Sequence, residues 1–220
     1  MSDLALSVYD EFLRNTDAGR LQKILARYEL FRMVMDRPGD IVECGVFKGS
    51  GIYTWTKLMR TFKPNSSGRV IGFDFFDADR EVTLKHRQDQ ECLDFHAEGW
   101  TSPAVIKATC AKWGFERVQL IAGNITETTK TFAENELGAR ISLLYIDVDN
   151  YEATKAILTH LYPRVVPGGI VAFDEYGLRG FGEADAVDEY FSGRPITLQS
   201  LPWATTPSAF IVKNGESGNA

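Results

Sequence analysis

The sequence predicts a doubly wound α/β domain, in which helices cover both faces of a mostly parallel sheet. Short apolar runs rich in β-branched residues alternate with longer stretches of helical periodicity. Strands that are apolar throughout are typical of a sheet that is covered on both faces. A length of 220 residues suits one well-buried core rather than two.

The predicted domain is a Rossmann-like, seven-stranded sheet spanning residues 39–213. Residues 1–38 are predicted to form a helical extension outside the core, and residues 214–220 a flexible tail. Six of the strands can be located from their apolar runs: Asp40–Val46, Arg69–Phe75, Arg117–Gly123, Ile141–Val148, Gly168–Glu175 and Ser208–Lys213.

Two of the stretches between strands are informative. Tyr151–Tyr162 has helical periodicity and ends before Pro163. The charged segment Arg80–Gly99 carries His86 and His96, and it is predicted to be an inserted helix that forms a lid. In an open α/β sheet ligands bind beyond the carboxyl ends of the strands, so the residues that follow each strand are the ones to inspect.

Composition and charge argue against several classes of protein. With 24 basic and 30 acidic residues the net charge is −6, which disfavours a nucleic-acid partner. The first residues mix charges with apolar positions, unlike a signal or transit peptide, and no apolar run approaches the ~20 residues that span a bilayer. Cys44, Cys92 and Cys110 form no CxxC pair, which suits a reducing cytoplasm and a structural role and disfavours zinc.

A glycine-rich loop, VECGVFKGSG, follows the first strand. Gly45 and Gly49 allow a tight turn close to a ligand, and Ser50 begins the next helix, whose amides are candidate cofactor contacts. The spacing GxxxGxG differs from the GxGxxG of nicotinamide-binding proteins. With Glu43 the loop reads ExGxxxG, and it resembles that of S-adenosylmethionine-dependent methyltransferases. The alternative is a structural glycine turn.

Polar residues follow the second and third strands. Asp74 is a candidate partner for two ribose hydroxyls. Asn124 stands where methyltransferases of this class often have an Asp that contacts the adenine amino group, and an amide oxygen can accept the same bond. A turn-forming Gly-Asn pair is the alternative for Asn124.

Four acidic residues follow the fourth and fifth strands. If these strands are neighbours, Asp147, Asp174 and Glu175 can point into one space, where oxygen ligands select a hard divalent cation, with Mg²⁺ favoured. The alternative is that each acid caps a helix or is solvated, and Asp149 is a credible N-cap for the helix at Tyr151.

The segments DVDNYEATKAILTHLYPRVVPGGIVAFDEY and VECGVFKGSG resemble the macrocin/mycinamicin-type (TylF/MycF-like) sugar O-methyltransferases of antibiotic biosynthesis, a metal-dependent branch of the class I methyltransferases. The resemblance implies S-adenosylmethionine and Mg²⁺ as cofactors and cytoplasmic methyl transfer to a hydroxyl of a vicinal diol on a sugar or secondary metabolite. It implies Asp147, Asp174 and Glu175 as metal ligands and Asp149 as the general base. It also gives Asp147 a part in catalysis and cofactor contact. Glu175 stands where Asp is usual, and the chain is shorter than typical members.

Other assignments stay open at this point. A catechol-type methyltransferase, a hydroxylase-like relative on the same fold and a non-catalytic binding protein fit the same pattern. His86 and His96 are rival bases. We expect a small-molecule acceptor and neither a nucleic-acid nor a membrane partner. The apolar positions of the leading helices favour a homodimer or higher homo-oligomer.

Overall fold

The computed structural model describes residues 3–76, 82, 84–95 and 100–215. Within these residues one sheet runs in the order β3-β2-β1-β4-β5-β6. All neighbouring strands are parallel except β5 and β6, which are antiparallel. The strands are β1 (Asp40–Cys44), β2 (Val70–Asp74), β3 (Val118–Ala122), β4 (Ile141–Ile146), β5 (Val165–Phe173) and β6 (Ala209–Val212).

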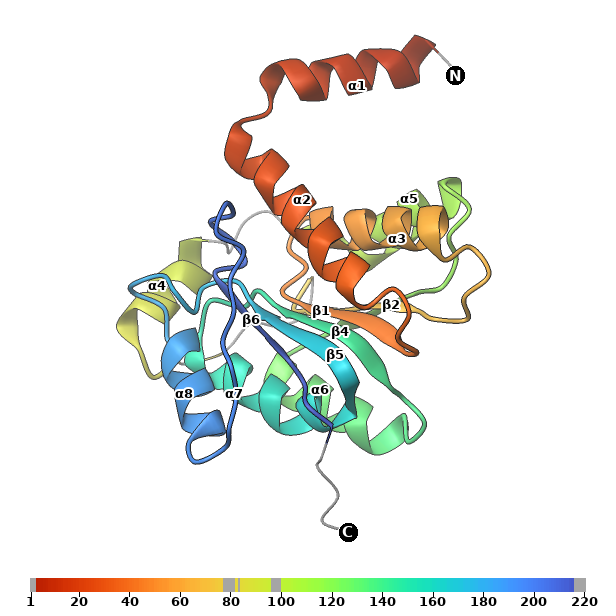
Figure 1. Cartoon of the computed structure of the whole chain (residues 1–220). Helices are drawn as coiled ribbons and strands as arrows, with labels where there is room; N and C mark the ends of the chain where they lie inside the picture. The colour runs from red at the N-terminus through yellow and green to blue at the C-terminus, as the bar shows by residue number, and fades with distance from the viewer. Residues whose placement is uncertain (1–2, 77–81, 83, 96–99, 216–220) are drawn as a thin grey trace.

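Helices cover both faces of this sheet (Figure 1). One face carries α2 (Ala18–Met33), α3 (Ser50–Phe62) and α5 (Pro103–Lys112), and the other α6 (Ile125–Asn135), α7 (Tyr151–His160) and α8 (Glu183–Phe191). Three further elements are α1 (Asp3–Asn15), α4 (Arg87–Phe95) and the short 3₁₀ helix η1 (Tyr162–Arg164). The predicted doubly wound architecture is therefore confirmed.

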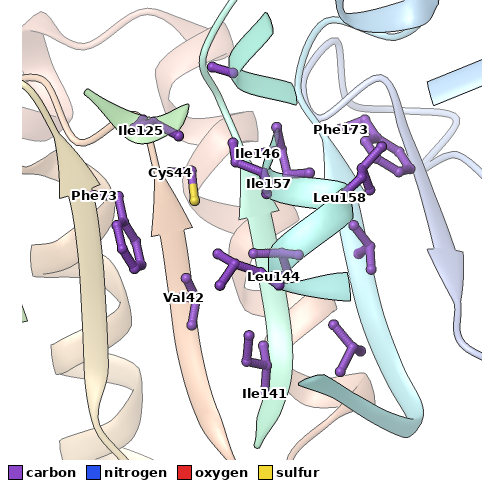
Figure 2. Packing of buried hydrophobic residues seen from close by; sticks show 14 of the residues in the cluster. Val42, Cys44, Phe73, Ile125, Ile141, Leu144, Ile146, Ile157, Leu158 and Phe173 are labelled. Atoms are coloured by element: carbon purple, nitrogen blue, oxygen red, sulfur yellow. The ribbon is translucent and has the colours of Figure 1, made fainter. Parts of the chain in front are cut away.

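The core has two layers, one on each face of the sheet. Figure 2 shows the layer under α6 and α7, where Ile157 and Leu158 pack against Leu144, Ile146 and neighbouring strand residues. On the other face, residues of α2, α3 and α5 pack against alternate residues of the same strands. Because β4 is buried on both faces, its side chains are apolar almost throughout, which explains why its run could be recognised in the sequence.

Two details of the fold differ from the sequence-based description. The predicted seventh strand is absent from the described residues, where the segment before β6 contributes only an isolated bridge between Gln199 and Phe210. Pro195 and Pro202 flank that segment, and proline cannot donate to a strand ladder. The N-terminal extension is also not wholly outside the core, because Leu30 and Phe31 of α2 are fully buried in one core layer.

The predicted lid and the predicted tail are only partly covered by the described residues. Part of the predicted lid is helical, as α4, whereas His96 lies outside the described residues. Most of the predicted flexible tail, residues 216–220, also lies outside them. In the part of the chain that the structure describes, no helix has the length and apolar character needed to cross a membrane.

Candidate active site

A cavity of about 970 Å³ opens at the carboxyl ends of β1 and β4. The sheet order reverses between these two strands, because β2 and β3 lie on one side and β5 and β6 on the other. Such a switch point is where open α/β sheets bind ligands, and the volume lies at the upper end of the roughly 300–1,000 Å³ usual for small-molecule sites. The cavity wall includes residues from both N-terminal helices, the glycine loop and the ends of β1, β2, β4 and β5.

The glycine loop is shaped by contacts that exclude a side chain. Gly45 has φ 92°, and a Cβ there would lie 1.6 Å from the carbonyl oxygen of Asp147. A Cβ on Gly51 would lie 1.8 Å from Glu43 Oε1. Gly49 has φ 87° at the N-cap of α3, and Ser50 follows it in the cavity wall. The loop therefore brings the β1 and β4 ends together and makes room for the Glu43 carboxylate.

Asp74 fastens the loop to the end of β2. Its Oδ2 accepts the N–H groups of Val46 and Phe47 at 2.7 and 2.8 Å. Its Oδ1 accepts Phe75 N–H and the indole N–H of Trp100. Four donors from the chain thus meet the roughly four acceptor positions of one carboxylate, so a ribose would have to displace one of them. Burial raises the pKa of Asp74, and these hydrogen bonds oppose that rise.

Asn124 lies in the cavity wall, where it caps α6. Its Oδ1 accepts the backbone N–H of Thr126 at 3.0 Å and the hydroxyl of Thr126 at 2.8 Å. Asn124 therefore caps a helix, a role that neither sequence-based alternative named, and its contact with adenine stays a prediction.

The acids after β4 and β5 gather at the same end of the cavity. Asp147, Asp149 and Glu175 each offer an oxygen atom within 4.8 Å of the other two. The N-cap of α7 is Asn150, whose side chain accepts Ala153 N–H at 2.8 Å, so Asp149 does not serve as the cap. Asp149 has φ 61°, a strained conformation for a residue other than glycine, and it faces the cavity.

Asp174, predicted as a metal ligand, contacts a lysine and a tyrosine in this structure. Its Oδ2 lies 2.8 Å from the ammonium of Lys23, and its Oδ1 accepts the Tyr145 hydroxyl. Lys23 also lies 3.0 Å from Asp147 Oδ2. The acids that the structure brings within one cation's reach therefore include Asp149 in place of Asp174.

A second cation from α2 enters the site one turn later. Arg27 is only 4% exposed, its Nη2 lies 2.9 Å from Glu43 Oε1, and its guanidinium stacks over the Tyr145 ring at 4.9 Å. Sequence reasoning missed both Lys23 and Arg27. A signal was present, because Arg27 falls in the apolar stripe with Leu30, Phe31 and Val34, where a buried basic residue requires an acidic partner.

Negative charge remains in excess at this end of the cavity. Burial, and after it the charge of Asp174, raises the pKa of Asp147 to about 7. Burial and the charges of Asp147 and Asp174 raise the pKa of Glu175 well above its usual value. Burial would also raise the pKa of Asp174, but Lys23 and hydrogen bonds lower it. Within the described residues, Glu175 Oε2 is buried without a hydrogen-bond partner, so a hard cation fits the donor set of Asp147, Asp149 and Glu175.

Glu183 was not predicted, yet it is fully buried behind the acidic group. Its Oε1 accepts the backbone N–H of Glu175 at 2.9 Å and so fixes the end of β5. Burial raises its pKa well above the usual value, and the charges of Asp174 and Asp147 add to the rise. The residue carried no recognisable signal, because it is one acid among several in an ordinary amphipathic helix.

The lid helix α4 is held against the site by a buried acid. Asp89 accepts the backbone N–H groups of Tyr151 and Gly182, each at 2.9 Å. On the same helix, Cys92 Sγ donates to Asp149 Oδ2 at 3.4 Å, and burial and Asp149 raise the pKa of this thiol to about 12. His86, just before α4, packs edge-on against the Tyr151 ring, and its role as a rival base stays a prediction.

Comparison with known proteins identifies the family. A family model described as Macrocin-O-methyltransferase (TylF) matches residues 18–201. The chain belongs to the TylF family. The match includes α2, the glycine loop, both acidic strand ends and α8, so the TylF-family region contains every side chain of the acidic site described above.

Two curated relatives and a crystal structure are similar to this TylF-family chain. Mycinamicin III 3''-O-methyltransferase from Micromonospora griseorubida is 28% identical over 160 residues, which are 70% of this chain and 60% of the relative. An 8-demethyl-8-(2,3-dimethoxy-alpha-L-rhamnosyl)-tetracenomycin-C 4'-O-methyltransferase from Streptomyces olivaceus is 30% identical over 157 residues, 70% of this chain and 58% of the relative. The crystal structure of CalS11, a calicheamicin methyltransferase, has a TM-score of 0.75 at 27% identity, covering 93% of this chain and 85% of CalS11.

The chain thus spans about 60% of the length of the curated relatives that it matches. The family resemblance inferred from the glycine loop and the acidic segments is confirmed. The roles of individual residues stay predictions.

Proposed function

We propose that this chain transfers the methyl group of S-adenosylmethionine to a hydroxyl of a vicinal diol on a sugar or other secondary metabolite. The observation that carries the proposal is the acidic group Asp147, Asp149 and Glu175 in the wall of a cavity at the switch point of the sheet. Family membership supports methyl transfer, and the name of the Streptomyces olivaceus relative, which prints a rhamnosyl group, supports a sugar hydroxyl as the acceptor.

The cofactor would lie along the glycine loop. Glu43, Gly45, Gly49 and Ser50 belong to this loop, and the amides at the start of α3 point a partial positive charge toward a bound carboxylate. Asp74 and Asn124 lie further along the same wall. We propose that Asp74 holds the loop in shape. A ribose hydroxyl would contact Asp74 only where one of the four present donors moves away from the carboxylate.

Asp149 is the proposed general base. The S–CH₃ bond of the sulfonium breaks, the O–CH₃ bond forms, and the proton of the acceptor hydroxyl passes to the carboxylate. Asp149 suits this role because it faces the cavity, is not the helix cap, and is held by the Cys92 thiol on the lid helix. Asp147 lies beside it and completes the negative end of the cavity.

Mg²⁺ is the proposed metal, and Asp147, Asp149 and Glu175 would hold it, each through one oxygen. When bound, such an ion supplies Lewis-acid assistance that lowers the pKa of the acceptor hydroxyl.

The test is methyl transfer from labelled S-adenosylmethionine to a panel of sugar diols and catechols, with and without EDTA. We expect transfer to a sugar diol that stops in EDTA and returns with Mg²⁺. Asp149→Asn should lower turnover by about 10²–10⁴-fold, the usual contribution of a general base, while S-adenosylhomocysteine still binds in calorimetry. Undiminished turnover in this variant would remove Asp149 as the base, and failure to bind S-adenosylhomocysteine in the unmodified protein would remove the methyltransferase proposal.

A further inference from the structure

Lys23 occupies the position between the β4 and β5 ends. Its ammonium bridges Asp147 Oδ2 and Asp174 Oδ2 at 3.0 and 2.8 Å, and the side chain is only 21% exposed. These two acids are 124 and 151 residues away in the chain, so α2 brings the charge in as a separate element. A lysine held by two carboxylates in a cavity wall is a fixed positive charge rather than a mobile surface group.

The two acids that Lys23 bridges differ in how many of their oxygen atoms already accept hydrogen bonds. Both oxygens of Asp174 accept hydrogen bonds, one from Lys23 and one from the Tyr145 hydroxyl. Asp147 engages Lys23 through Oδ2, and it still offers an oxygen to the group with Asp149 and Glu175. Glu175 Oε2, more than nine-tenths buried, has no hydrogen-bond partner among the described residues. The side of the acidic site that can accept another cation is therefore the side away from Lys23.

We propose that Lys23 keeps the divalent cation away from Asp174, restricts it to Asp147, Asp149 and Glu175, and weakens its binding. This inference rests on the proposed function, because it takes the acidic group to bind a cation. A fixed charge of +1 within several ångströms of a +2 ion repels it by more than the energy of a tenfold change in affinity, at an effective dielectric constant of about 20. Lys23 therefore determines both the ligand set and the affinity of the metal.

The test measures Mn²⁺ binding to the full chain by the loss of the free-ion electron paramagnetic resonance signal. Lys23→Met should bind Mn²⁺ at least about tenfold more tightly than the unmodified protein, since the repulsion is removed and Asp174 becomes a ligand. Lys23→Arg, which keeps the charge, should bind as weakly as the unmodified protein. Arg32→Met is the matched control. It removes an exposed positive charge from the same helix, and the partner of that charge, Glu29, lies outside the site.

A double-mutant cycle tests the ligand set itself. Asp174→Asn should change Mn²⁺ affinity only a few-fold alone, and in the Lys23→Met background it should erase the gain. Equal or weaker Mn²⁺ binding by a folded Lys23→Met protein overturns the inference and leaves the proposed function intact. If neither protein binds Mn²⁺ and labelled methyl transfer continues in EDTA, the metal part of the proposed function fails, and the inference fails with it.

Discussion

Gly45 has a backbone conformation on which the position of the acidic group depends. It combines a positive φ with an approach to the Asp147 carbonyl that no Cβ could share. Asp147 N–H in turn donates to the Cys44 carbonyl at 2.8 Å, so the β1 and β4 ends are joined directly at the residue that begins the acidic group. The position of Asp147 thus depends on the absence of a side chain at residue 45.

Gly45→Ala should therefore disrupt the site as well as the fold. We expect a loss of unfolding free energy of several kcal/mol, because the strain of a positive φ adds to a clash with backbone atoms that cannot move aside. Gly180→Ala is the matched control: Gly180 has φ 97°, and a Cβ added there would have no atom within 4 Å, so only the backbone strain of about 1–3 kcal/mol should appear. Urea unfolding of both variants measures the difference, and equal losses would show that the close contact with Asp147 is unimportant.

At the scale of elements, the strands were predictable and the role of α2 was not. Each strand is a local apolar run, so the predicted bounds of β1 to β6 lie within about two residues of the observed ones. The exception is the start of β5, which begins at Val165, earlier than predicted. The acidic ends followed from the parallel order of these strands. Lys23 and Arg27 did not follow. The partners of Lys23 lie 124 and 151 residues away, and that of Arg27 lies on β1, so only the packing of α2 on the sheet brings these charges together.

Asp89 is the buried side chain that attaches the lid helix α4 to α7 and to the segment before α8. Asp89 uses one oxygen for Tyr151 N–H and the other for Gly182 N–H, so Asp89→Asn would replace one acceptor with an NH₂ group facing a donor. We expect a loss of about 1–3 kcal/mol in unfolding free energy and faster amide exchange in α4. Asp94→Asn, on an exposed position of the same helix, should change neither quantity. Unchanged amide exchange in Asp89→Asn would contradict this role.

His160 links α7 to α6 and gives a prediction for pH. Its Nδ1 lies 3.0 Å from Thr129 Oγ1, and burial, with the charge of Lys130 in addition, lowers the pKa of His160. The unfolded chain therefore binds a proton more readily than the folded chain, so stability falls as pH decreases through the unfolded value of about 6.5. Urea midpoints at pH 8 and pH 5.5 should differ less in His160→Gln than in the unmodified protein. A difference of the same size in both proteins would assign the pH dependence to other groups.

At the scale of the whole molecule, the cavity is built from parts that are distant in the chain. Phe12 of α1, Arg27 of α2, the glycine loop, the lid helix and the ends of β4 and β5 all contribute to its wall. Local sequence patterns identified the loop and the strand ends, which are fixed by the sheet. They could not identify the N-terminal wall, because its contacts depend on how helices outside the sheet dock onto it.

The same N-terminal helices carry the prediction of a homo-oligomer. In Figure 1, α1 extends away from the sheet and its covering helices. Its apolar side chains are exposed, including Val8, Tyr9 and Leu13 at 52–59%, and Leu21 and Leu25 continue the apolar surface onto α2. An exposed apolar surface of this kind is typical of a protein interface, and a symmetric pair of identical copies is the commonest arrangement.

We therefore expect light scattering on a sizing column to give a mass of at least twice the 24.6 kDa of one chain. The double variant Tyr9→Glu and Leu13→Glu should reduce this mass to that of one chain, because two charges on one face of α1 would be buried without partners in the interface. Leu137→Glu is the control, since Leu137 is 75% exposed in the loop before β4, far from α1 in the sequence. A single-chain mass for the unmodified protein would refute the predicted oligomer. A reduced mass in the control alone would place the interface at Leu137 instead. Because Phe12 lines the cavity, we also expect the double variant to bind S-adenosylhomocysteine less tightly if the paired α1 helices hold that wall in place.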